Sequence, residues 1–175
     1  ISRSEKQFKT LFEQAPEGIL MAGLSDLRIL EANETLRQWL GYRREELTGF
    51  ALDEMDGGKI PLLMDLARQM VQKGLVFSGE TRLKRKGGAF LEAELTAIQY
   101  HFQDEETMLF FIRDISDRLK DTERIRLSQK ALESTLNGIV ICDALKKDYP
   151  AIYVNPAFSL ITGYGKEEIL GKSLR

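Results

Sequence analysis

The sequence repeats itself at a domain-sized distance, and this repeat constrains the fold more than any other feature. Residues 33–52 read NETLRQWLGYRREELTGFAL and residues 155–174 read NPAFSLITGYGKEEILGKSL, so seven residue types recur at a constant offset of 122. Upstream, the Glu, Gly and Ile of residues 13–19 recur in residues 133–139 at an offset of 120. Because solenoid repeats are about 20–50 residues long, the pattern predicts a duplicated domain.

The second copy is shorter than the first. It ends at Arg175, which stands opposite Asp53, so a counterpart of residues 54–116 is missing. An incomplete domain is expected to expose apolar side chains that its missing strands would cover. We therefore expect three parts, namely a complete first domain over 1–116, a linker over 117–136 and the N-terminal part of a second domain over 137–175.

Composition argues against several functional classes. The 25 Lys and Arg against 27 Asp and Glu give a net charge of −2, which provides no basic surface for nucleic acid or an anionic membrane. Cys142 is the only cysteine, which fits a reducing compartment without disulfides. The sequence shows no Cys/His cluster, no Ser/His/Asp set and no phosphate-binding loop. We expect a cytoplasmic segment with no catalytic residues, no metal site and no membrane contact.

The first half of the first copy reads as strands and capped helices. A short helix is predicted over residues 4–14, followed by two strands, a helix that begins after Asn33, and a longer helix over about Ile60–Lys73. Asn33 and its counterpart Asn155 are typical N-cap residues, whose side-chain oxygen accepts a hydrogen bond from the first helical turn.

Three long strands follow. Apolar residues alternate with a period of two in residues 77–84 and 91–97, and Gly87-Gly88 predicts a tight turn between these two strands. The third strand, residues 108–112, is apolar on both faces. The apolar parity slips after Ala97, which predicts a β-bulge or a strong twist. Strands on both sides of a helical block predict an α+β domain. In it, five antiparallel strands in the order 2-1-5-4-3 carry helices on one face.

Several motifs resemble those of PAS domains, the sensory modules of bacterial signalling proteins. They are FxxLFEQAPEGI at Phe8–Ile19, EAN before a helix, GYxxEELxG, and RDISDR at Arg113–Arg118. The resemblance covers nearly the whole chain and implies the PAS fold, followed by a linker helix and a partial second PAS domain. In the family an Asp-Ile-Ser/Thr triad ends the last strand and couples it to an exit helix. The resemblance therefore implies a signal-relay role for Asp114, Ile115 and Ser116.

The second copy is similar to the flavin-binding LOV branch of the family through its VNPAFxxITGYxxEEILG sequence. LOV photoreceptors continue with GxNCR, whose cysteine attacks the flavin, whereas residues 171–175 of this chain read GKSLR. Leu174 stands at the cysteine position and has no thiol, so LOV photochemistry is not expected. Cys142 lies on a strand and does not substitute for it.

A hollow is expected between the long helix and the sheet. Its candidate lining is Met64, Met70, Phe77, Leu95, Phe110 and Ile112. These side chains could hold a small apolar or flat ligand, or they could simply fill the core. The cofactor stays unknown. Flavin is possible but unsupported, because the family's redox type places a tryptophan and an asparagine near the third strand, where this chain has Phe77 and no asparagine. Haem is not expected, because haem-binding PAS domains use a histidine on the long helix. That helix has no histidine here, and His101 lies on a strand.

The linker is rich in charge and contains neither glycine nor proline, which predicts a helix. Its apolar stripe is imperfect and consists of Leu119, Thr122, Ile125, Ala131, Leu132 and Leu136. A homodimer through this helix and the N-terminal helix is the hypothesis for its partner. The expected function is a sensory module that relays a small-molecule or redox signal to a diguanylate cyclase/phosphodiesterase or, next in order, a histidine kinase. The alternative is a ligand-free dimerisation scaffold.

Overall fold

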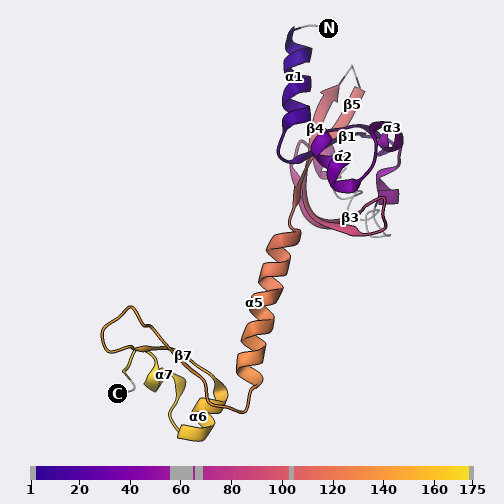
Figure 1. The fold of residues 1–175 in the computed structure, drawn as a ribbon. Coiled ribbons are helices and arrows are strands. Elements are labelled where there is room, and N and C mark those ends of the chain that lie inside the picture. Colours follow the sequence, from indigo (N-terminus) through magenta and orange to yellow (C-terminus); the bar gives the residue numbers. More distant parts are fainter. Residues whose placement is uncertain (1–2, 56–64, 66–68, 103–104, 174–175) are drawn as a thin grey trace. The chain divides into compact units, whose positions relative to one another are not determined.

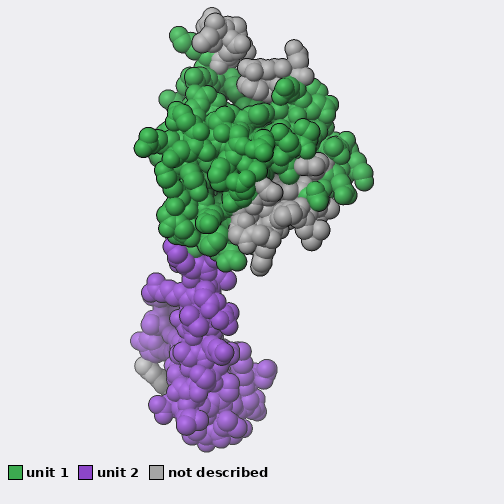
Figure 2. All heavy atoms as spheres, turned by 90° about the vertical axis from the view of Figure 1, so that its right-hand side faces the viewer, with its two compact units in different colours: residues 1–117 green, residues 118–175 purple. Residues whose placement is uncertain are grey.

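The computed structural model describes residues 3–55, 65, 69–102 and 105–173. These residues fall into two compact units, Ile1–Asp117 and Arg118–Arg175 (Figure 2). The linker that the sequence sets apart thus belongs, from Arg118 onward, to the second unit. Most of the helix predicted over Ile60–Lys73 lies outside the described residues, and so does the candidate Met64.

The first unit is built on a five-stranded antiparallel sheet (Figure 1). Its strand order is β2-β1-β5-β4-β3, which places the first hairpin beside the last strand. The predicted α+β class and strand order are confirmed. The strands are β1 (Gly18–Gly23), β2 (Ile29–Ala32), β3 (Phe77–Lys84), β4 (Phe90–Phe102) and β5 (Glu105–Asp114).

Short helices cover one face of this sheet. They are α2 (Glu34–Leu40), α3 (Arg44–Leu47) and the 3-10 helix η1 (Leu52–Met55). Leu36 and Leu40 of α2 are fully buried against inward-facing strand residues in the main core. Gly41, at φ 76°, ends α2 in the left-handed conformation that glycine adopts without strain.

The opposite face is covered in part by α1 (Arg3–Gln14). Ile19 and Met21 alternate along β1 with residues of the main core and pack with Phe12 and Leu109 in a second cluster. Phe8 extends this cluster by stacking on Tyr100, with ring centroids 6.3 Å apart. The two faces of the sheet are therefore both apolar where a helix covers them.

This second cluster explains why the parity of β4 changes after Ala97. The predicted bulge is wrong, because the pairing of β4 with β5 runs without a register shift from Ala93↔Asp114 to Phe102↔Glu105. Up to Ala97 the apolar residues face the main core, and beyond it Ile98 and Tyr100 face the cluster under α1. The apolar parity changes because the covered face changes.

The second unit repeats the start of the first. Helix α5 (Ser116–Ser134) precedes a two-stranded sheet and two short helices. A register shift lies between Ile141 and Cys142, as it does between Met21 and Ala22 at the offset of 120. The remaining elements are β6 (Val140–Cys142), β7 (Ala151–Val154), α6 (Pro156–Thr162) and α7 (Lys166–Ile169).

Apolar residues of the second unit are less completely covered than their counterparts. A small core contains Ala151, Val154 and Ile169. In contrast, Ile141 and Ile161 are exposed, Ile161 by 68%. Their counterparts at offsets of 120 and 122 are the buried Met21 and the half-buried Trp39, which pack in the two clusters of the first unit.

Candidate functional site

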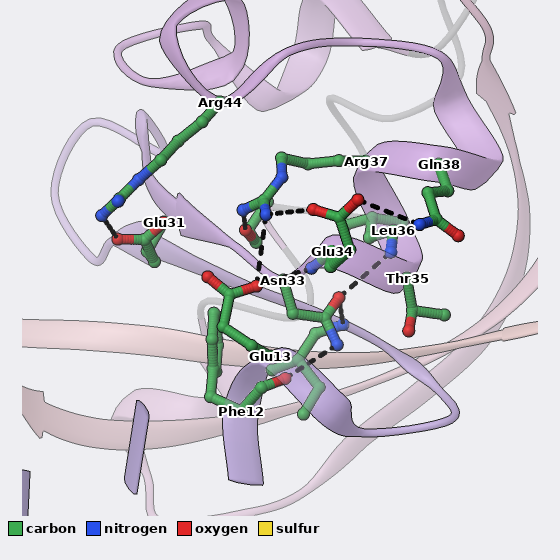
Figure 3. Close-up of polar contacts among 12 residues, drawn as sticks. Phe12, Glu13, Glu31, Asn33, Glu34, Thr35, Leu36, Arg37, Gln38 and Arg44 are labelled. Atoms are coloured by element: carbon green, nitrogen blue, oxygen red, sulfur yellow. Dashed lines mark hydrogen bonds and ion pairs between the residues drawn. The ribbon is translucent and has the colours of Figure 1, made fainter. Parts of the chain in front are cut away.

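Asn33 is a fully buried side chain that joins three segments of the first unit (Figure 3). Its Oδ1 accepts hydrogen bonds from Ile19 N (2.9 Å) on β1 and Leu36 N (3.1 Å) in the first turn of α2. Its Nδ2 donates to Phe12 O (3.1 Å) in α1 and to Glu17 O (2.9 Å). All four hydrogen-bonding positions of the amide are thus used.

Charged side chains add to this connection between α1 and α2, as Figure 3 shows. Glu13 Oε2 accepts from Glu34 N (2.9 Å) and lies 3.2 Å from an Arg37 guanidinium nitrogen. Arg37 also donates to Glu34 Oε2 and to Ala32 O, both at 2.5 Å. Thr35 Oγ1 donates to Ala15 O at 2.7 Å. We call this set of contacts, between residues 12–17 and 33–37, the first joint.

The charges of the first joint stabilise one another's ionised forms. The hydrogen bond from Arg37 lowers the pKa of the Glu34 carboxyl, and a bond from Gln38 and the charge of Arg37 lower it further. Burial lowers the pKa of Arg37, but hydrogen bonds and charges from Glu34 and Glu13 outweigh it, so the pKa is raised. Both groups are therefore charged at neutral pH.

The second unit contains the same asparagine geometry. Asn155 Oδ1 accepts from Ile139 N (2.7 Å) and Phe158 N (3.0 Å), and Nδ2 donates to Leu132 O (3.0 Å) and Asn137 O (2.9 Å). Each partner is the counterpart of an Asn33 partner at an offset of 120 or 122. We call these contacts, between residues 132–139 and 155–158, the second joint. Helix α5 thus occupies the place in the second unit that α1 occupies in the first.

The predicted pocket residues come together in the main core. Phe77, Leu95, Phe110 and Ile112 are buried there, and Met70 packs against them half-buried. The four buried residues lie on β3, β4 and β5 and face the side of the sheet that α2 and α3 cover, whereas Met70 lies outside the strands. The described candidates thus belong to, or pack against, the main core on one face of the sheet.

The relay candidates lie where β5 passes into α5. Asp114 Oδ1 accepts a hydrogen bond from Ser116 N (2.8 Å), at the residue where the helix begins. Ile115 is buried, 3% exposed, and its N donates to Glu92 O (2.9 Å) on β4. The first turn of α5 is thus tied to two strands of the sheet.

Along α5, which is described over its whole length, no side chain is buried. Ile125 is 60% exposed. Leu132 is seven residues further and lies on the same face, whereas Leu119 is six residues earlier and about 120° away at 3.6 residues per turn. The apolar residues predicted to form a coiled-coil stripe therefore do not all lie on one face of α5.

Sequence reasoning missed the charged part of the first joint. Glu13 recurs as Glu133, and this recurrence was a signal that could have found it. Arg37 gave no signal, because its partner lies 24 residues away. Elsewhere, His101 is exposed and 3.6 Å from Glu106. Among the described residues no group of three His, Cys, Asp or Glu side chains could hold a metal ion.

No helix in the described ranges is both long and apolar enough to cross a bilayer.

Comparison with known proteins identifies the family to which this sequence is similar. The sequence matches the family described as PAS domain over residues 16–117 and again over residues 136–175. Sporulation kinase E of Bacillus subtilis (strain 168) is 27% identical over 98% of this chain, and probable diguanylate cyclase DgcE of Escherichia coli (strain K12) is 30% identical over 71%. The chain spans 23% and 12% of these proteins, less than a quarter of either.

A solved structure supports the fold. The PAS domain of an HTR-like protein from Haloarcula marismortui matches with a TM-score of 0.58 and 22% identity, over 64% of this chain and 92% of that one. At this identity the likeness concerns the fold, which agrees with the strand order β2-β1-β5-β4-β3. Since the family match covers well over half of the sequence, the chain belongs to the PAS domain family.

Proposed function

We propose that this chain is the sensory and relay segment of a signalling protein, in which the first unit senses and α5 transmits. The observation that carries the proposal is the connection at Asp114, Ile115 and Ser116. A change in the sheet that moves β4 or β5 acts directly on the first turn of α5, because Ile115 is bonded to Glu92 and Ser116 to Asp114.

For the output we favour a diguanylate cyclase/phosphodiesterase, with a histidine kinase next. The support is that one relative of low identity is named a probable diguanylate cyclase and another a sporulation kinase. The catalytic part would lie outside this segment.

We further propose that residues 137–175 are the first part of a second PAS domain of LOV-like sequence. The repeated asparagine bonds and the repeated register shift support a shared fold. Leu174, at the position of the reactive LOV cysteine, lies outside the described residues. Cys142, on β6, is exposed. A relay role without cysteine–flavin chemistry fits this sequence.

The signal would reach the first unit as a small apolar or flat molecule among the core residues, or as a redox change of a bound cofactor. A specific observation favours the second candidate function, a ligand-free dimerisation scaffold. Phe77, Leu95, Phe110 and Ile112 are each 4% exposed or less and belong to one packed cluster. Side chains that pack against one another at the density of a protein interior can complete a core without a ligand.

The partner we propose is a second copy of the chain, bound through α1 and α5. Leu11 on α1 and Ile125 on α5 are exposed apolar side chains on helices. Exposed apolar residues on a long helix are typical of helix–helix association.

The test is the absorption spectrum of the purified chain, together with mass spectrometry of small molecules released on denaturation and light scattering for mass. A bound chromophore or a released molecule supports sensing, and a colourless, empty dimer supports the scaffold. A colourless, empty monomer of 20.0 kDa would contradict both.

A further inference from the structure

The two joints differ in three residues that make contacts beyond the asparagine. Glu34 has an N–H that donates to Glu13, and its counterpart Pro156 has none. Arg37, which binds the Glu13 carboxylate, is replaced by Ser159. The second joint therefore lacks the groups that fasten α1, although it keeps the carboxylate as Glu133.

The third difference removes a hydroxyl. Thr35 donates to Ala15 O at 2.7 Å, whereas its counterpart is Ala157. What remains between α5 and the start of α6 is the bond from Asn155 Nδ2 to Leu132 O. Among the described residues, this is the polar contact that holds the end of the helix.

Packing differs in the same direction. Phe12, at the end of α1, is 6% exposed and packs with Ile19, Met21 and Leu109. Its counterpart Leu132 is half-buried, and no side chain of α5 is buried. The small core of the second unit is formed by strand residues and by α6 and α7. Within residues 1–175, apolar burial therefore stabilises the attachment of α1 more than that of α5, in part because Leu109 on β5, which packs with Phe12, has no counterpart in this segment.

We propose that the second joint is a releasable attachment, in which α5 separates from the second unit by breaking the Asn155–Leu132 bond while that unit stays folded. Asn155 would still cap α6 through Oδ1, and the core of β7, α6 and α7 would be unchanged. This deepens the relay function proposed above and rests on it for its consequence: a helix that is firmly held at Ser116 and weakly held at Leu132 yields at Leu132.

The test measures the freedom of α5 relative to β6 by electron paramagnetic resonance. Cys142 on β6 is exposed and is the natural label site. The second label is Asp121→Cys, which at 1.5 Å per residue lies roughly 20 Å from the end of α5 and so amplifies any swing. The reference pair is Lys6→Cys with Ser78→Cys in a Cys142→Ser background, which reports α1 against β3.

We expect a broader distance distribution for the α5 pair than for the reference pair. Asn155→Asp keeps an oxygen that caps α6 but replaces the Nδ2 donor by a carboxylate oxygen, which faces Leu132 O and Asn137 O, so it should broaden the distribution further. Amide exchange in the last turn of α5 should then become roughly fivefold faster, as the loss of the one hydrogen bond that holds α5, to Leu132 O, implies. Unchanged exchange in α7 and β7 would show that the second unit is still folded.

A gain-of-contact variant makes the proposal independent of any folding defect. Ser159→Arg restores the counterpart of Arg37 beside Glu133 and should narrow the distribution toward that of the reference pair. The proposal is overturned if the wild-type α5 pair is as narrow as the reference pair, or if Ser159→Arg leaves it unchanged. The absorption spectrum that tests sensing has no bearing on this result, so the two proposals fail separately.

Discussion

The first and second joints share one asparagine geometry but differ in everything around it. In each, the amide side chain ties the end of a helix to a strand and to the next helix. At the first joint, charged contacts and a buried phenylalanine surround the amide. At the second, proline, alanine and serine stand where those contacts would form. The difference teaches that a repeated motif fixes where two segments meet, while its neighbours decide how firmly they are held.

The largest expected difference between the joints is in packing. Phe12→Ala should lower the free energy of unfolding of the first unit by about 3 kcal/mol, because it opens a cavity under α1. Trp39, the single tryptophan, reports this unit by fluorescence during urea unfolding. The matched variant Leu132→Ala should cost the second unit less than about 1 kcal/mol, since Leu132 is half-buried. Equal losses, measured for the second unit by hydrogen exchange, would remove the contrast.

Loss of the asparagine should come next. Asn33→Ala leaves four backbone groups without their partner and should cost about 2 kcal/mol, measured by Trp39 fluorescence. Asn155→Ala should cost about 1 kcal/mol, because Leu132 and Ile139 are partly exposed and water can replace the lost bonds. A larger loss at Asn155 than at Asn33 would contradict this order.

The charged contacts should have a smaller effect. Glu13→Gln should destabilise the first unit by about 1 kcal/mol or less, since the Glu13 and Arg37 side chains are 26% and 14% exposed. The control is Glu133→Gln, whose carboxylate is exposed at the second joint and should be silent. Thermal unfolding of both variants in the same buffer makes the comparison, and equal shifts would show that the ion pair adds nothing.

The smallest effect should be a dependence on pH. The folded-state pKa of Glu34 lies below its ordinary value of 4.5, chiefly through its bond to Arg37. Its contribution to stability is therefore fully present above that value and is lost as pH falls through the lowered pKa. Urea unfolding of the first unit, followed between neutral and acidic pH, should show the loss. Glu34→Gln should flatten it, and a curve that this variant does not change would refute the assignment.

The sequence predicted features that depend on a few neighbouring residues and missed contacts between distant segments. The capping role of Asn33 and Asn155 depends on the first turn of the following helix, so the residue pattern alone indicated it. The bonds of Asn33 to Phe12 and Glu17 join segments 21 and 16 residues apart. Nothing in a local pattern predicts such contacts. The same holds for Glu13 and Arg37, which meet because α1 and α2 are packed together.

The strand after Ala97 shows a second limit of sequence-based prediction. Its change of apolar parity was visible in the sequence, but parity does not say whether the backbone shifts or the covering layer changes. The continuous register and the cluster under α1 show that the covering layer changes. Likewise, the burial of Phe77 and Leu95 followed from alternation, whereas their close packing in one core is a property of the assembled layers.

By itself, the sequence predicted two related copies, determined the α+β class of the first, and indicated which asparagines begin the helices. These follow from periodicity and capping, which act over a few residues. The tertiary structure decided which helix end each asparagine holds and how strongly. Those properties depend on side chains brought together from distant segments. In this chain the neighbours of the asparagine, rather than the asparagine itself, distinguish a fastened helix from a releasable one.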